Sequence, residues 1–167
     1  MLPSEYMTVI VLPTVDEYLT AMGDLRRAIL ACQVSHHVRD YVAHAGGGSM
    51  ADVDRKMRSL CKFSYDVLEG VANGSKHCGR DRGDFRFVPG DAKPVLPFAF
   101  DVAGAGWDEG RFDGPGLEVE HEGHRVFIDF CVCAVLGSFG RAFPAEFGAV
   151  DLERYGQRVP GWTSPPP

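Results

Sequence analysis

The sequence lacks the patterns that mark most common enzyme and membrane classes. It has no glycine-rich phosphate loop of either standard pattern, no GxSxG, no HExxH and no CxxC. The apolar run at residues 7–12 is too short for a membrane span or a signal-peptide core, and it ends in Pro13. We therefore expect no cofactor, no membrane contact and a cytoplasmic location.

Cysteine is also too sparse and too irregular for a disulfide framework. The five cysteines are an odd number and include no CxxC pair; they are Cys32, Cys61, Cys78, Cys131 and Cys133. Each is expected to serve as a small buried apolar residue. Two residues that are two apart on a helix face different ways, so the last pair cannot jointly bind a metal.

An excess of basic charge is absent as well. The net charge of −6 argues against a protein that coats nucleic acid. Residues 1–80 are balanced, whereas residues 81–167 carry eight Lys/Arg and fourteen Asp/Glu. The acids concentrate in the segment 101–122, opposed there only by Arg111. This segment is a solvated surface, a nucleic-acid mimic or a binding patch for a basic protein partner.

What the sequence does contain is a strong helical periodicity in its first half. Thr14 and Glu17 have the spacing of a capping box, which predicts a first helix from Thr14. The apolar pattern then runs to His44 as one helix, or as two helices that meet near residues 33–35. The glycines at 46–48 end it.

A second helix is predicted to begin at Ser49, with Asp52 in its first turn, and to end near residues 73–74. Because the linker is short, the two helices should form a long antiparallel hairpin. Glycine, proline and short aromatic runs then indicate a small β-element at about residues 84–127. It includes a hairpin that turns at Glu122-Gly123.

Residues 126–143 are strongly apolar and predict a buried C-terminal helix, with strand as the alternative for its first turn. This helix lies at the centre of the bundle or forms a dimer face. The predicted fold class is therefore α+β, mainly α, as a single globular domain over residues 1–155. Residues 156–167 form a Pro-rich tail.

The most informative pattern is the hexapeptide RDYVAH at residues 39–44. Arginine matches the oxygens of a phosphate, and histidine serves as a base near neutral pH. Asp40 lies four residues before His44 and can orient its ring. Because residues five apart point in different directions on a helix, Arg39 and His44 meet only at a helix end or across a dimer. The alternative is an ordinary helix end, with Arg39 solvated and His44 favoured by the helix dipole.

The pattern of Arg39, Asp40 and His44 resembles the signature of the HEPN superfamily of small helical prokaryotic proteins, found in toxin–antitoxin, abortive-infection and CRISPR systems. The resemblance implies a homodimer and a metal-independent endoribonuclease that acts on RNA. In that case Arg39 clamps the phosphate, His44 is the base and Asp40 is their polar companion. It also allows a non-catalytic relative from a defence or toxin module.

A second segment, at residues 73–77, is similar to a helix-ending Asn-x-x-Lys-His run found in some HEPN-like variants and in uncharacterised bacterial helical proteins. It leads into a basic stretch, so phosphate or RNA binding is assigned to Lys76, His77, Arg80 and Arg82. The alternative is a helix cap followed by a solvated turn.

A metal site is the third possibility considered. His36, Asp40 and His44 recur every four residues on one helical face, but the second helix offers no matching ligands, so no metal is expected. The competing function is a non-enzymatic interaction module or inhibitor that uses the acidic segment 101–122.

Overall fold

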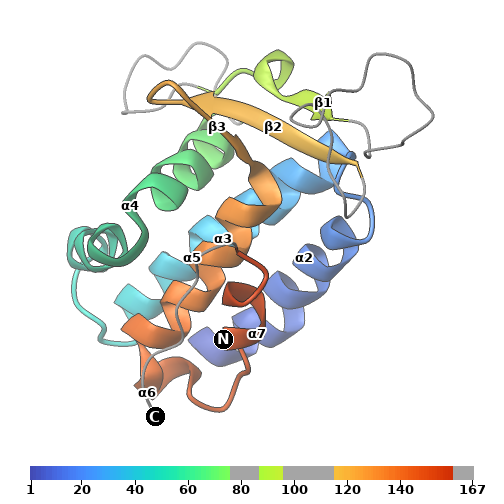
Figure 1. Ribbon diagram of the computed structural model, residues 1–167. Helices are drawn as coiled ribbons and strands as arrows, with labels where there is room; N and C mark the ends of the chain where they lie inside the picture. The colour runs from blue at the N-terminus through green and yellow to red at the C-terminus, as the bar shows by residue number, and fades with distance from the viewer. Residues whose placement is uncertain (76–86, 96–114, 160–167) are drawn as a thin grey trace, which may run out of the picture.

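The computed structural model describes residues 1–75, 87–95 and 115–159. Helices form most of this part of the chain, and a small antiparallel sheet lies across one end of them (Figure 1). The helices are α1 (Pro3–Tyr6), the π-helix η1 (Met7–Val11), α2 (Leu12–Leu19), α3 (Leu25–His44), α4 (Met50–Gly74), the 3-10 helix η2 (Pro89–Asp91), α5 (Ile128–Ala142), α6 (Pro144–Phe147) and α7 (Glu153–Gly156). The strands are β1 (Lys93–Val95), β2 (Gly116–His121) and β3 (His124–Phe127). The predicted fold class, mainly α with a small inserted β-element, is confirmed.

The first helix begins earlier than the sequence indicated. The prediction of a start at Thr14 is wrong, because Pro3 occupies the first turn and Glu5 accepts the Leu2 backbone N–H at 2.9 Å. Thr14 lies inside the helix instead and donates its hydroxyl to the Ile10 carbonyl. Proline has no N–H and crowds the carbonyl four residues before it, so Pro13 accounts for the wide π turn that precedes it.

Neither alternative for the first helical stretch is observed: α3 is continuous through residues 33–35, but it does not join α2 into one helix. The chain instead breaks after α2, and Asp24 caps the new helix by accepting the Arg27 N–H. Gly46 and Gly48 adopt positive φ in the turn to α4, and Ser49 is the N-cap of α4 with Asp52 in its first turn, as predicted. The predicted pair of helices joined by a short turn is therefore observed, and α3 and α4 pack on each other, but α4 is not one straight helix.

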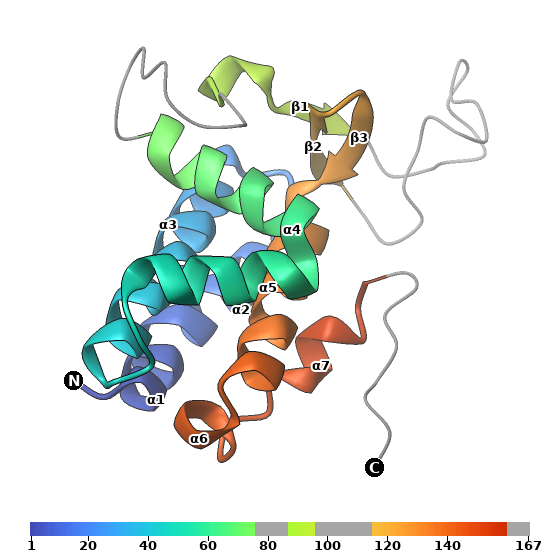
Figure 2. The ribbon, with the colours of Figure 1, turned by 90° about the vertical axis from the view of Figure 1, so that its left-hand side faces the viewer.

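Helix α4 bends sharply at Cys61, whose φ of −147° and ψ of 47° are not helical. Figure 2 shows its two halves running in clearly different directions. The Tyr65 hydroxyl donates to Asp54 Oδ1 at 2.6 Å, although eleven residues of straight helix would span about 16 Å. The bend therefore closes toward this side of α4.

The sheet has the order β1-β2-β3, with Lys93 opposite Glu118 and Glu118 opposite Phe127. Glu122 and Gly123 both have positive φ, as a type I′ turn requires, so the predicted hairpin is confirmed. Leu117, Val119 and His121 are buried on one face of β2. This face covers the helices.

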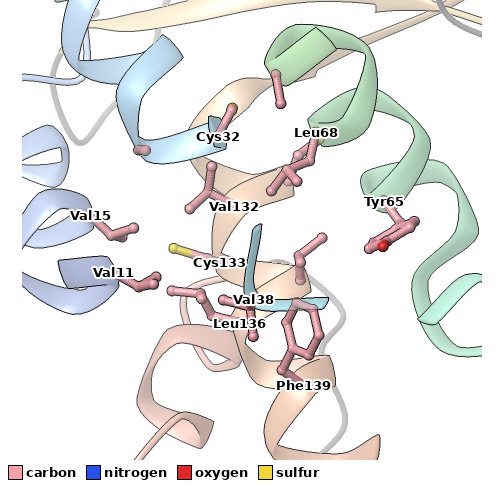
Figure 3. Packing of buried hydrophobic residues seen from close by; sticks show 14 of the residues in the cluster. Val11, Val15, Cys32, Val38, Tyr65, Leu68, Val132, Cys133, Leu136 and Phe139 are labelled. Carbon is pink, nitrogen blue, oxygen red and sulfur yellow. The ribbon is translucent and has the colours of Figure 1, made fainter. Parts of the chain in front are cut away.

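The core surrounds α5, which is buried along nearly its whole length. Its Val132, Leu136 and Phe139 lie between Val11 and Val15 of the first helix and Leu68 of α4 (Figure 3). Of the two placements considered for the apolar C-terminal helix, the centre of the bundle is the one observed. None of the helices in the described ranges combines the length and apolar character of a membrane span.

Candidate functional site

The structure does not bring Arg39 and His44 together. Arg39 points from α3 toward α4, where its Nη1 donates to both carboxylate oxygens of Asp54 at 3.0 and 2.9 Å. Its side chain is only 20 % exposed. His44, at the last position of α3, is exposed on another side of the helix. The ends of the hexapeptide therefore belong to two different environments.

Arg39 is part of an ion cluster on the inner side of the bend in α4, referred to below as the kink cluster. Arg58 Nε donates to Asp66 Oδ1 at 2.8 Å, and Arg58 also pairs with Glu69. Glu69 Oε1 lies 3.6 Å from Arg39 and 3.8 Å from His36 Nε2. The kink cluster consists of His36, Arg39, Asp54, Arg58, Tyr65, Asp66 and Glu69.

Burial and pairing fix the protonation states in the kink cluster. Burial lowers the pKa of His36 from its usual 6.5, and Glu69 offsets this effect only in part, so His36 is neutral at pH 7. The neighbouring His36, with Arg58 and Arg39, holds the pKa of Glu69 below its usual range. Burial and the Asp54 carboxylate raise the pKa of Tyr65. The cluster thus surrounds a neutral imidazole and a neutral phenol with arginine and acidic side chains.

The other side of α3 forms a groove of about 590 Å³. Here His37 Nδ1 lies 2.8 Å from Asp40 Oδ2, and both side chains are more than two-fifths exposed. This α3 groove is lined by Met1, Tyr6, His37, Asp40, Tyr41 and His44. Asp40 and His44 of the predicted site therefore share a surface with His37, and Arg39 does not line it.

Two tyrosines give the α3 groove a rigid wall. The rings of Tyr6 and Tyr41 stack with centroids 4.0 Å apart and planes 12° apart. The Tyr6 hydroxyl donates to the Val34 carbonyl at 3.2 Å. Burial, with Tyr41 nearby, raises the pKa of Tyr6 to about 12, so this hydroxyl keeps its proton at neutral pH. The wall anchors the first helix against α3.

The groove has the components of an acid–base site. A carboxylate that accepts from one imidazole nitrogen orients the ring and favours the proton on that nitrogen. His37 and His44 are seven residues apart, which is two helical turns or about 10 Å on one face of α3. Two imidazoles on one face can divide the roles of base and acid.

Sequence analysis missed His37. The signal was its position three residues before Asp40, which suits a contact along a helix as well as the four-residue spacing to His44 does. Asp40 binds His37 in the structure. Asp54, Tyr65 and Glu69 were missed too. Asp54 lies before the bend in α4 and meets Arg39 across the turn between the helices, whereas the bend brings Glu69 to Arg39 and Tyr65 to Asp54.

The predicted phosphate-binding residues Lys76, His77, Arg80 and Arg82 lie outside the described residues. The last described residue before them is Ser75, whose Oγ accepts a hydrogen bond from Gln33 Nε2 at 2.9 Å. Gln33 is one helical turn before His37 on α3. The end of α4 is thus fixed beside the middle of α3.

The described residues contain no group of three His, Cys, Asp or Glu side chains that could hold a metal ion. His36 is buried beside Glu69, whereas Asp40 contacts His37 in the groove, so the helical stripe of His36, Asp40 and His44 does not converge.

The acidic segment 101–122 is described only from residue 115 onward. Within that part, Glu118 lies 3.4 Å from Arg125 and Glu122 lies 3.6 Å from Lys62, while Glu120 is exposed. Two of these three carboxylates therefore have a cation within the same chain.

Comparison with known proteins adds no assignment, because no family model, no curated protein and no solved structure matches this chain.

Proposed function

We propose that the protein is a metal-independent endoribonuclease with the α3 groove as its active site. The observation that carries the proposal is the 2.8 Å contact between His37 Nδ1 and Asp40 Oδ2, with His44 in the same groove. This combination supplies an oriented base and a second proton carrier without a metal ion. The resemblance of residues 39–44 to the HEPN signature supports the same class of reaction.

In this reaction His37 takes the proton of a ribose 2′-hydroxyl on Nε2, since Nδ1 faces Asp40. The 2′-oxygen attacks phosphorus, the bond from phosphorus to the 5′-oxygen breaks, and His44 gives a proton to that leaving oxygen. The products are a 2′,3′-cyclic phosphate and a free 5′-hydroxyl. After this step His37 is protonated and His44 is neutral, the reverse of the starting state. Hydrolysis of the cyclic phosphate, with His44 as base and His37 as acid, returns both to that state.

The proposal departs from the resemblance at Arg39, which is held by Asp54 and Glu69. We assign the phosphate contact instead to the basic residues that follow Ser75, beginning with Lys76. Their charge would stabilise the crowded phosphorane. From the resemblance we also propose a homodimer that acts in the cytosol as part of a prokaryotic defence or toxin module.

The test is cleavage of a mixed single-stranded RNA pool in the presence of a chelator. His37→Ala and His44→Ala should each reduce cleavage at least about a hundredfold, because each removes one proton carrier. His124→Ala is the matched control, since His124 is an exposed histidine of the β-hairpin, outside the groove. Intact RNA with the wild type, with and without added metal, would refute the nuclease.

A second candidate is a non-enzymatic interaction module or inhibitor. The observation that favours it is the engagement of Arg39 within the kink cluster, so that no arginine is found among the described residues that line the α3 groove. The acidic segment 101–122 would then bind a basic protein. Glu120→Gln should weaken capture of that partner more than Glu118→Gln or Glu122→Gln, because the latter two carboxylates already face Arg125 and Lys62.

A further inference from the structure

We propose that Arg39 is a positioning residue, which links the bend in α4 to the orientation of His37 in the α3 groove. The link runs from Tyr65 through Asp54, Arg39 and Asp40 to His37. It deepens the proposed function, since it assigns a role in that site to residues which do not line it.

The far end of the link is rigid. Tyr65 is fully buried, and its hydroxyl donates to Asp54 Oδ1 at 2.6 Å. Asp54 accepts Arg39 Nη1 on both oxygens, at 3.0 and 2.9 Å. Asp54 precedes the non-helical residue Cys61 and Tyr65 follows it, so the bend supplies the hydroxyl that orients the carboxylate bound by Arg39.

The near end reaches the groove through the Asp40 carboxylate. Arg39 Nε is buried, has no hydrogen-bond partner and lies 3.5 Å from Asp40 Oδ1. The other oxygen of Asp40, Oδ2, lies 2.8 Å from His37 Nδ1. One carboxylate thus has the guanidinium on one side and the imidazole on the other.

This ion pair favours the orientation of the carboxylate that His37 needs. A carboxylate held on one oxygen has less rotational freedom, and its second oxygen then favours the tautomer with the proton on Nδ1. That tautomer leaves the lone pair on Nε2, where the proposed reaction takes up a proton. Without Arg39, Asp40 can rotate into solvent, because its side chain is 42 % exposed.

The decisive measurement is the tautomer of His37 by long-range nitrogen–proton correlation spectroscopy, at about pH 8, where imidazole is neutral. In the wild type and in Arg39→Lys, which keeps a cation at this position, His37 should carry its proton mainly on Nδ1. Arg39→Gln and Asp54→Asn should shift it toward the Nε2–H form. His44 and His124 in the same spectra are internal references and should not change.

Tyr65→Phe is a milder variant that should preserve the fold, because it removes a single oxygen. It should shift the His37 tautomer in the same direction but by less. The RNA assay supplies a second readout, in which Arg39→Gln should lower kcat about tenfold with KM unchanged.

An unchanged His37 tautomer in folded Arg39→Gln, with a changed one in Asp40→Asn, would overturn the link between Arg39 and Asp40. The tautomer does not require turnover. If the wild type leaves RNA intact, the proposed nuclease activity is refuted. The His37 tautomer in the variants would still test the role of Arg39.

Discussion

At the scale of single residues, two adjacent histidines of α3 have different surroundings because they lie on different faces of the helix. His36 faces α4, is 2 % exposed and lies beside Glu69. His37 faces the groove and contacts Asp40. The sequence allowed Asp40 to orient a histidine, but both His37 and His44 have suitable spacing, and only the side-chain rotamer selects between them.

The burial of His36 predicts a pH-dependent stability. Its folded-state pKa is lowered from 6.5, so the unfolded chain binds the proton more readily and stability is lost as pH falls below 6.5. We expect the free energy of unfolding to fall between about pH 7.5 and pH 5.5. The fall should be smaller in His36→Gln than in the wild type, by up to about 1 kcal/mol. Urea denaturation at both pH values measures this difference.

The control for that measurement is His124→Gln, a change at an exposed histidine that should retain the wild-type pH dependence. Glu69 does not obscure the comparison. Its pKa is lowered from 4.5, so the stability it contributes is present above 4.5 and is lost only at still lower pH. An equal pH dependence in His36→Gln and the wild type would contradict the assignment to His36.

At the scale of elements, the sequence predicted several features that depend on local signals, although the equally local pattern of Thr14 and Glu17 gave the wrong start for the first helix. The start of α4 at Ser49, the turn at Glu122-Gly123 and the apolar helix α5 are all confirmed. The bend at Cys61 was not predicted, because the apolar periodicity of α4 continues through it without glycine or proline. The bend instead coincides with side-chain contacts between the two halves of α4.

Arg58 provides the test of the bend. It joins the two halves by pairing with Asp66, whose side chain is 2 % exposed, and with Glu69. Arg58→Ala should lower the free energy of unfolding by about 2–3 kcal/mol, less than for a fully buried pair because Arg58 is itself one-third exposed and Lys62 still pairs with Asp66. Chemical denaturation at neutral pH measures the loss.

Arg55→Ala is the matched variant on the same helix. Arg55 is 76 % exposed and pairs with Asp52 on the surface, so its loss should cost no more than about 0.5 kcal/mol. Similar losses in the two variants would show that the kink cluster contributes no more than a surface ion pair.

At the scale of the whole molecule, the sheet and the segment that leads into it are placed on the helices by contacts between residues far apart in the chain. One of them is between Gly74, the last residue of α4, and Phe87, which precedes η2 and β1: a Cβ added at Gly74 would overlap the carbonyl oxygen of Phe87. Phe63 of α4 also packs on His121 of β2, with ring centroids 5.0 Å apart. The sequence predicted a β-element of this size, but its docking depends on contacts far apart in the chain, which local patterns do not encode.

Gly74→Ala tests this docking. In an ordinary helix alanine is more favourable than glycine by about 1 kcal/mol. Here the clash with backbone should reverse the sign and destabilise the protein by about 1–3 kcal/mol, which thermal unfolding measures. Gly90→Ala is the control, because nothing lies within 4 Å of its added Cβ. A stabilised Gly74→Ala would mean that Phe87 does not pack there.

The hydrogen bond between Tyr155 of α7 and Asp16 of α2 has a consequence for the order of folding. It joins residues 139 apart at 2.7 Å, so nearly the whole chain becomes one closed loop. The bonds of α4 across its bend join residues only eight to eleven apart and cost far less entropy to close. We expect the bend to form early and the contact of α7 to form last. This last contact then governs how fast the protein unfolds rather than how fast it folds.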